Sequence, residues 1–222
     1  MNVIVLGGTG MIGQGVLREC LLAGDVNRVL TIGRSATGVQ NVKLQEIVRA
    51  DLWNYAPVEE QLRGFDACFF CLGVTSAGMS EADYTRVTYG IAVAAADALC
   101  RLNPGMTFVF VSGAGADSTE QGRLMWARVK GKTENAILRM PFKASFVFRP
   151  GVVLPMHGER SRTTAYRVLY AITKPLLPLL KRIMPGAIVT TEQFGRAMLV
   201  VARQGAPKRV LESADINALV PA

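Results

Sequence analysis

A glycine-rich run near the amino terminus has the spacing of a phosphate-binding loop. It directly follows the apolar segment Val3–Leu6 and contains the pattern G-x-G-x-x-G. In this pattern one glycine permits a tight turn, one lets a diphosphate approach the backbone, and one packs the next helix closely against the strand. The free N–H groups and the partial positive charge of that helix then face the phosphates. We therefore predict dinucleotide binding by Gly7, Gly8, Thr9, Gly10, Met11, Ile12 and Gly13.

The residues after the second expected strand predict which dinucleotide is bound. An acidic residue there would bind the 2′-hydroxyl of the adenosine ribose and select NAD. Residues 28–38 contain no acidic residue, and Arg34 and Ser35 stand at this point instead. A guanidinium and a hydroxyl suit a 2′-phosphate, so NADP is favoured over NAD. Asp51 and Leu52, after the third strand, are placed to meet the adenine, although Asp51 could equally cap a helix.

Short runs of β-branched or aromatic residues alternate with longer segments of helical periodicity. The runs are almost wholly apolar, as is typical of parallel strands covered by helices on both faces. This alternation predicts an α/β fold, a doubly wound parallel sheet of the Rossmann type. The expected strands are Val3–Leu6, Arg28–Ile32, Leu44–Val48, Ala67–Leu72, Met106–Val111, Ser145–Phe148 and Arg209–Leu211. The expected helices span residues 12–21, 81–102 and 122–140, and a last helix runs from a capping box at Thr190 to about Arg203.

Length and composition predict a single domain over residues 1–222, with a small carboxy-terminal substrate or lid region. Of the 222 residues, 50% are hydrophobic and 19% are charged, which is enough apolar surface to form a core without disulfides or metals. A disordered or disulfide-stapled protein is thereby excluded. The net charge of +8 favours anionic partners, such as phosphorylated cofactors, acidic substrates, anionic lipid or nucleic acid.

Two of the four cysteines form a C-x-x-C pattern that superficially suggests a metal or redox site. Cys68 and Cys71 lie in the apolar run 67–72, and residues three apart on a strand point to opposite faces. The chain has a single histidine, His157, so no second Cys/His pair is available. We therefore predict packing cysteines in a reducing compartment and no metal site.

The amino terminus predicts a cytoplasmic protein. Residues 1–6 lead directly into the glycines, without a basic region or a long apolar region of the kind found in secretory signals. Elsewhere, the most apolar stretch is residues 163–184, which charged residues and prolines interrupt. It therefore lacks the ~20 uninterrupted apolar residues that a membrane-spanning helix needs.

Together with the glycine loop, four further features give the chain a family resemblance. Two of them close the fourth and fifth expected strands, one follows the sixth, and the other is a lysine on a helix. They are Cys71-Leu72-Gly73, Val111-Ser112-Gly113, Arg149-Pro150-Gly151 and Lys130. On these residues, nearly the whole chain resembles the short-chain dehydrogenase/reductase superfamily. It is most similar to the atypical branch that includes epimerase/dehydratase-, NmrA- and Tat-interacting-protein-like proteins. The resemblance implies NAD(P) contacts at Cys71, Leu72, Gly73, Lys130 and Pro150.

The same resemblance identifies a missing catalytic residue. In catalytic members, a Ser or Thr after the fifth strand is followed by Tyr-x-x-x-Lys on one face of the next helix. The lysine holds the nicotinamide ribose and lowers the phenol pKa, and the tyrosine exchanges the proton that accompanies hydride transfer. Ser112 and Lys130 match this pattern, but Trp126 occupies the tyrosine position. An indole N–H can only donate a hydrogen bond, so the usual proton transfer cannot use residue 126.

Three functions remain open at this point. The first is NADP(H) binding without turnover, in a redox-sensing or regulatory protein. The second is a divergent oxidoreductase for a carbonyl or quinone-like substrate, with Ser112 orienting the carbonyl and Tyr166, Tyr170 or His157 supplying the proton. The third is a binding protein at a membrane surface. The substrate, the occurrence of turnover and the oligomeric state, monomer or homodimer, are left open.

A basic, proline-broken segment spans residues 150–190. Between Glu159 and Arg182 it carries six basic residues and one acidic residue, with apolar residues among them. In the family this region covers the substrate pocket, so we expect a lid over an apolar or anionic small molecule. Basic and apolar faces also suit an anionic membrane surface. Nucleic-acid binding is not favoured, because the chain has no recognised module and few aromatic residues lie among the charges.

Overall fold

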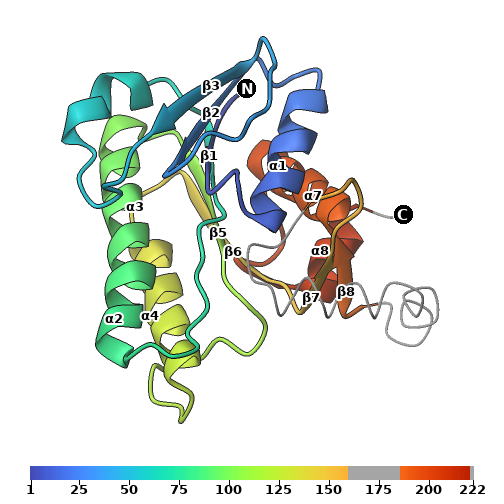
Figure 1. The fold of residues 1–222 in the computed structure, drawn as a ribbon. Coiled ribbons are helices and arrows are strands. Elements are labelled where there is room, and N and C mark those ends of the chain that lie inside the picture. Colours follow the sequence, from blue (N-terminus) through green and yellow to red (C-terminus); the bar gives the residue numbers. More distant parts are fainter. Residues whose placement is uncertain (160–185, 221–222) are drawn as a thin grey trace.

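The computed structural model describes residues 1–159 and 186–220 of the chain. Its centre is a seven-stranded sheet in the order β3-β2-β1-β4-β5-β6-β9, with every neighbouring pair parallel. Helices cover both faces of the sheet, so the fold has three layers (Figure 1). The predicted doubly wound Rossmann fold is confirmed.

The strands match the predicted apolar runs. Their bounds are β1 Asn2–Leu6, β2 Arg28–Gly33, β3 Leu44–Val48, β4 Ala67–Phe70, β5 Thr107–Val111, β6 Ala144–Arg149 and β9 Val210–Glu212. From β1 the chain builds outward to β2 and β3, then returns to place β4 on the other side of β1. Open parallel sheets bind ligands at such a reversal, beside the carboxyl ends of the strands.

The helices divide between the two faces of the sheet (Figure 1). One face carries α1 Met11–Leu22, α7 Thr191–Gln204 and α8 Ser213–Leu219. The other carries α2 Glu81–Thr85, α3 Ile91–Leu102 and α4 Met125–Arg139, with the π-helical turn η2 Arg86–Gly90 and the 3₁₀ segment η1 Ala56–Leu62. Helices on both faces explain why the inner strands, such as β1, β4 and β5, are almost wholly buried and apolar, whereas the edge strand β3 carries the exposed residues Gln45 and Glu46.

The sheet separates two hydrophobic cores, one on each face. Successive residues of a strand point to opposite faces, so they pack in different cores. On β1, Val3 and Val5 pack in the core that includes residues of α1 and α7, whereas Ile4 packs in the core that includes residues of α3. The cysteines divide in the same way: Cys68 lies in the α3-side core, and Cys71 packs against the α1-side core. The two cysteines therefore pack on opposite faces of the sheet, as the spacing predicts.

Helices α1 and α7 approach each other closely because each presents a glycine to the other. A Cβ on Gly15 would lie 2.6 Å from the Cβ of Thr191, and a Cβ on Gly195 would lie 2.8 Å from the Cγ of Glu19. Any larger residue at either position would force the helices apart. The helix that bears the glycine loop therefore rests directly on the carboxy-terminal part of the chain.

The capping box predicted for α7 is confirmed. The Thr190 hydroxyl accepts a hydrogen bond from the Gln193 N–H (3.0 Å), and the Gln193 side chain accepts one from the Thr190 N–H (3.2 Å). Two of the four N–H groups that a helix start leaves unpaired are satisfied in this way. The start of α7 is thus fixed by local sequence.

The helix expected at 122–140 begins later, at Met125, because Asp117 organises the preceding residues into a turn. Its carboxylate accepts hydrogen bonds from the Thr119 hydroxyl (2.6 Å) and the Gly122 N–H (2.6 Å). The Thr119 hydroxyl and then this backbone N–H lower the pKa of Asp117. Local side-chain bonds of this kind compete with helix formation.

Two further predicted limits differ from the structure. The helix expected at 81–102 is interrupted by η2, a single π-turn. Such turns inside α-helices are frequent at functional sites. β4 ends at Phe70, two residues before the expected Leu72, and Cys71 continues the ladder only through an N–H bond to Leu6 O (2.8 Å).

A second sheet of two short parallel strands was not predicted. β7 Val152–Leu154 pairs with β8 Ile188–Thr190. These strands come from the two ends of the predicted lid segment 150–190; its central part, with Tyr166 and Tyr170, lies outside the described residues. Among the residues that the structure describes, no helix combines the length and apolar character needed to cross a membrane.

Candidate functional site

The loop after β1 turns back on itself and packs α1 against the end of the strand. Gly7 has a φ of +86°, and the Gly10 N–H donates to Gly7 O (3.0 Å). A Cβ on Gly7 would lie 2.9 Å from the backbone of Cys71, and a Cβ on Gly13 would lie 2.1 Å from Gly7 O. These are the tight turn and the close helix–strand contact that a dinucleotide-binding loop requires.

The start of α1 presents backbone donors to the space above this loop. Its N-cap, Gly10, has no side chain that could bond them, and its first turn contains no acidic residue. The Gln14 N–H donates to Gly10 O (2.8 Å), and the Gln14 side chain bonds Thr9 O (3.0 Å), which holds the loop on the helix. The N–H groups of the first turn and the positive end of the helix dipole therefore favour an anion.

The other predicted residues lie along the same edge of the sheet, on either side of the loop, because all the strands are parallel. Arg34 and Leu52 follow β2 and β3 on one side of β1, and Ser112 and Pro150 follow β5 and β6 on the other. A dinucleotide with its diphosphate on the loop would extend its nucleosides in opposite directions along this edge. The β2–β3 side is the expected adenosine side, and the β5–β6 side is the expected nicotinamide side.

A cavity of about 140 Å³ opens between the ends of β2, β3 and β4 and the turn η2. Its lining, which we call the strand-end cavity, consists of Arg34, Ala50, Leu52, Trp53, Phe70, Leu72, Gly73, Val74, Val87, Thr88 and Ile91. The lining is mainly apolar, with one charged side chain. Four predicted cofactor contacts therefore share one concave site: Arg34, Leu52, Leu72 and Gly73. A flat apolar group joined to an anion suits such a lining.

Arg34 and Ser35 are exposed at the end of β2. In the part of the chain that the structure describes, Arg34 forms no ion pair, so its guanidinium is open to an external anion. Asp51 does not line the strand-end cavity, and its carboxylate accepts N–H bonds from Trp53 (2.8 Å) and Asn54 (3.3 Å). Asp51 therefore binds the local backbone but caps no helix, since Tyr55 is the N-cap residue of η1. Its contact with the adenine stays a prediction.

Cys71 and Pro150 adjoin the site through their backbones. The Cys71 N–H donates to Leu6 O (2.8 Å), and Pro150 O accepts from the Ala114 N–H (2.9 Å). These bonds extend the strand ladders past β4 and β6. They fix the loops that border the two sides of the predicted dinucleotide position.

Lys130 and Trp126 lie one turn apart on α4, beside the end of β5. Lys130 Nζ donates to Val111 O (3.3 Å). Burial lowers the pKa of Lys130 to about 8, and the Glu134 carboxylate opposes this shift. Trp126 lies against the loop after β5, where a Cβ on Gly115 would be 3.5 Å from Cη2 of the indole.

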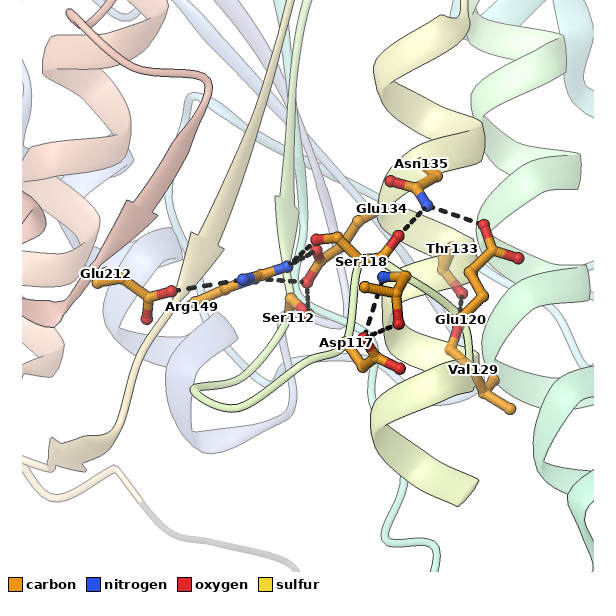
Figure 2. A network of polar contacts seen from close by, with 11 residues as sticks. Ser112, Asp117, Ser118, Glu120, Val129, Thr133, Glu134, Asn135, Arg149 and Glu212 are labelled. Carbon is orange, nitrogen blue, oxygen red and sulfur yellow. Dashed lines mark hydrogen bonds and ion pairs between the residues drawn. The ribbon is translucent and has the colours of Figure 1, made fainter. Parts of the chain in front are cut away.

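A buried polar network holds the hydroxyl of Ser112. The hydroxyl donates to the Glu134 carboxylate, whose side chain is 1% exposed and forms an ion pair with Arg149. Figure 2 shows Arg149 reaching between Glu134 on α4 and Glu212, the last residue of β9, and its Nη2 also donates to Ser118 Oγ (2.6 Å). Hydrogen bonding to Glu134 raises the pKa of Arg149 above its ordinary value. The network therefore joins α4 to the ends of β5, β6 and β9.

His157 lies apart from Lys130, near the start of α7. Its Nε2 is 2.9 Å from a Glu192 carboxylate oxygen, and this contact lowers the pKa of Glu192. His157 lines a different cavity of about 420 Å³, bordered by α1 and by the residues after β2. Of the three predicted proton donors only His157 is described, and it does not lie at the end of β5.

Two residues of this region were missed from the sequence. Glu134 follows Trp126 and Lys130 at a spacing of four, so one helix face carries all three, and this spacing could have identified it. Trp53 lines the strand-end cavity immediately after Leu52. Its only signal was its place beside a predicted adenine contact.

A family model described as NAD(P)H-binding matches residues 7–139, which is more than half of the chain. The chain belongs to this NAD(P)H-binding family. The match begins at the first residue of the glycine loop and ends with α4. Together with the fold and with the relatives and solved structures described below, this match supports the resemblance to the atypical branch of the short-chain dehydrogenase/reductase superfamily.

Relatives of this NAD(P)H-binding protein occur in fungi and in a mammal. Protein FMP52-1, mitochondrial, of Scheffersomyces stipitis is 31% identical over 72% of this chain and 69% of that protein. Protein FMP52, mitochondrial, of Eremothecium gossypii is 27% identical over 99% of this chain and 97% of its own length. Protein HTATIP2 of Rattus norvegicus is 29% identical over 69% of this chain and 63% of its own length.

Solved structures share the fold at low sequence identity. WbmF of Bordetella bronchiseptica, in complex with NAD⁺, has a TM-score of 0.69 at 14% identity and covers 98% of this chain and 76% of its own. The dTDP-glucose 4,6-dehydratase DesIV of Streptomyces venezuelae, with NAD and TYD bound, has a TM-score of 0.68 at 17% identity, over 96% of this chain and 75% of its own. These similarities support the Rossmann architecture.

The predicted cytoplasmic localisation is contradicted by the relatives. Both FMP52 proteins are named as mitochondrial. The prediction rested on residues 1–6, and residues 2–6 form the central strand β1. Their apolar character therefore reflects the fold and carries no information about the compartment.

Proposed function

We propose that this NAD(P)H-binding protein prefers NADP(H) and acts as a redox-sensing or regulatory protein, without tyrosine-dependent proton transfer. The observation that carries the cofactor preference is Arg34, exposed beside an apolar cavity at the end of β2 and without an ion-pair partner among the described residues. A planar guanidinium binds phosphate through two parallel N–H bonds.

The residues along the strand ends fit this cofactor. The first turn of α1 would hold the diphosphate, Arg34 and Ser35 the 2′-phosphate, the strand-end cavity with Leu52 the adenine, and Lys130 the nicotinamide ribose. Close packing around the glycine loop supports the fit, because a Cβ on Gly7 or Gly13 would strike neighbouring backbone and displace the loop from the start of α1. When bound, the reduced cofactor can donate a hydride.

An acidic side chain close to this position is already engaged. Glu46 on β3 accepts hydrogen bonds from the Thr31 hydroxyl (3.0 Å) and the Thr37 N–H (2.8 Å). Its carboxylate therefore stabilises the turn that follows β2. This leaves Arg34 as the charged side chain of the strand-end cavity, which supports preference for a 2′-phosphate.

Replacing Arg34 by glutamate tests the cofactor preference. We expect NADPH affinity to fall about a hundred-fold, because at least one charge-assisted phosphate bond worth ~1.5–3 kcal/mol is lost and a repulsive charge is added. NADH affinity should change only a few-fold. Arg63→Glu is the matched control, since Arg63 is also exposed but precedes β4, at the opposite edge of the sheet. Calorimetry showing the same loss for NADPH and NADH would contradict the assignment.

Two features on the expected nicotinamide side support a role without turnover. Trp126 occupies the position of the catalytic tyrosine and has no acid–base equilibrium to offer. The hydroxyl of Ser112 donates to Glu134 instead of facing a substrate carbonyl. Both groups that would polarise and protonate a carbonyl in catalytic relatives are thus either replaced or engaged.

Lys130 supports a second candidate, a divergent oxidoreductase acting on a carbonyl or quinone-like substrate. Its ammonium lies at the end of β5 with a pKa lowered to about 8, so it holds a proton near neutral pH and releases it just above. It would supply the proton that the tyrosine supplies in relatives. This candidate requires Lys130 in its charged form.

The two candidates differ in one measurement, the consumption of NADPH with a panel of carbonyls and quinones. The regulatory role predicts no consumption at any pH and different affinities for NADPH and NADP⁺. The oxidoreductase predicts consumption that decreases as pH rises through about 8, because Lys130 is then deprotonated. In that case Lys130→Gln should abolish both the activity and its pH dependence. Consumption that is unchanged in Lys130→Gln would exclude Lys130 as the proton source.

A further inference from the structure

Trp53 places an aromatic ring at the strand-end cavity, on the adenosine side of the glycine loop. It follows Leu52 after β3 and is 42% exposed, so the indole is only partly covered by the protein. Exposed tryptophan is unusual unless its ring meets a partner. The other walls of the cavity are supplied by strand ends and by η2, including Leu72 and Val87.

The indole is held in place by the π-turn η2. Its Nε1 donates to Arg86 O (3.4 Å), and the Arg86 guanidinium lies 5.6 Å from the ring centre. Gly90, at the end of η2, allows the closest approach, since a Cβ there would lie 3.2 Å from Nε1. Asp51 fixes the same residue from the other side by accepting the Trp53 N–H. The ring is therefore oriented before any ligand arrives.

The cavity chemistry defines the ligand group that this ring suits. An apolar lining with an exposed indole favours a flat aromatic group, and the charge of Arg34 among the same lining residues favours an anion attached to it. Adenosine 2′-phosphate has both features. A pre-oriented aromatic wall also reduces the ordering entropy lost when a ligand binds.

We propose that Trp53 is a stacking platform for the adenine ring, and that the contact of its indole with Gly90 on η2 sets the strength of adenosine binding. This inference rests on the proposed dinucleotide site and adds a residue that determines affinity for its adenosine half. Trp53 acts together with Arg34: the indole holds the base, and the guanidinium holds the 2′-phosphate.

The first test uses 2′,5′-ADP, which carries the adenosine half alone, and nicotinamide mononucleotide, which carries the other half. Trp53→Ala should weaken binding of 2′,5′-ADP and NADPH by the same factor, about ten- to a hundred-fold, as expected for loss of one base–aromatic stack. Binding of the mononucleotide should not change. Trp53→Phe should restore most of the affinity, and circular dichroism should show that both variants are folded.

Gly90→Ala tests the indole contact without removing the tryptophan. The added Cβ would press on Nε1 at 3.2 Å and displace the ring. We expect a several-fold loss of 2′,5′-ADP affinity in this variant, and no further loss when Gly90→Ala is combined with Trp53→Ala. An additive loss in the double variant would show that Gly90 acts elsewhere, and it would overturn the role assigned to this contact.

Fluorescence provides an independent readout because the chain has two tryptophans. In Trp126→Phe, which retains Trp53, 2′,5′-ADP should change the emission; in Trp53→Phe, which retains Trp126, it should not. Unchanged 2′,5′-ADP affinity in Trp53→Ala, with NADPH still bound by the wild type, would overturn this inference and leave the proposed function intact. If the wild type binds neither NADPH nor 2′,5′-ADP, both proposals fail.

Discussion

Replacing Glu134 by glutamine should lower the free energy of unfolding by about 3 kcal/mol, the lower end of the range for a broken buried ion pair. The substitution keeps the size of the side chain but leaves the Arg149 charge without its buried partner. The loss stays near the lower end because Arg149 retains Glu212 and Ser118 as partners. Urea unfolding followed by circular dichroism measures this change.

Asp25→Asn is the matched control, since it also converts a carboxylate that pairs with an arginine into an amide. The pair of Asp25 with Arg203 is exposed, at 54% and 38% of the two side chains, so its loss should change stability by less than about 1 kcal/mol. Equal changes in Glu134→Gln and Asp25→Asn would show that the buried network contributes no more than a surface pair. The network's role in holding α4, and with it Lys130, would then be wrong.

Gly13→Ala should reduce NADP(H) affinity by about a hundred-fold or more, which corresponds to the loss of one or two charge-assisted bonds to phosphate. The new Cβ would lie 2.1 Å from Gly7 O and 3.1 Å from the Cα of Gly8, and neither atom belongs to a flexible side chain. Relief requires α1 to move away from the loop, which would misplace the N–H groups of its first turn. Calorimetric titration measures the affinity, and a destabilisation of about 1–3 kcal/mol should accompany the loss.

Gly24→Ala provides the control, because a Cβ there meets no atom within 4 Å and the residue follows the same helix. It should leave affinity and stability close to those of the wild type. Gly10→Ala should have a much smaller effect than Gly13→Ala, since its Cβ would make only an ordinary van der Waals contact, 3.5 Å from Gly7 O. If Gly13→Ala bound NADPH as tightly as Gly24→Ala does, close helix–strand packing would not be a requirement of the site.

The fold was predictable because its strands are short, apolar and separated by helical segments. Alternate residues of a strand pack in the cores on the two faces of the sheet, so every residue of a run such as Val3–Leu6 is apolar. Such a continuous apolar run indicates a buried parallel strand. The structure departs from prediction where a single side chain determines the start of a helix, or where two very short strands pair. Asp117 delays the start of α4, and β7 and β8 are strands of three residues from distant parts of the chain.

The candidate site was predictable where the backbone would bind the cofactor, and less so where side chains from distant elements meet. The glycine loop follows from local spacing, and Arg34 follows from its place after β2. The partnership of Ser112 with Glu134 depends on how α4 packs beside β5, and no local pattern at Ser112 indicates its partner. Trp53 likewise becomes part of a cavity only when η2 packs against it.

The glycine contact between α1 and α7 links the two ends of the chain thermodynamically. α1 begins at the proposed diphosphate position, and α7 lies beyond residues 7–139, which the family model matches. A ligand that stabilises the position of α1 must also oppose local opening of α7, because Gly15 and Gly195 share one tightly packed surface. Protection of α7 against hydrogen exchange would then report occupancy of a pocket built near the opposite terminus.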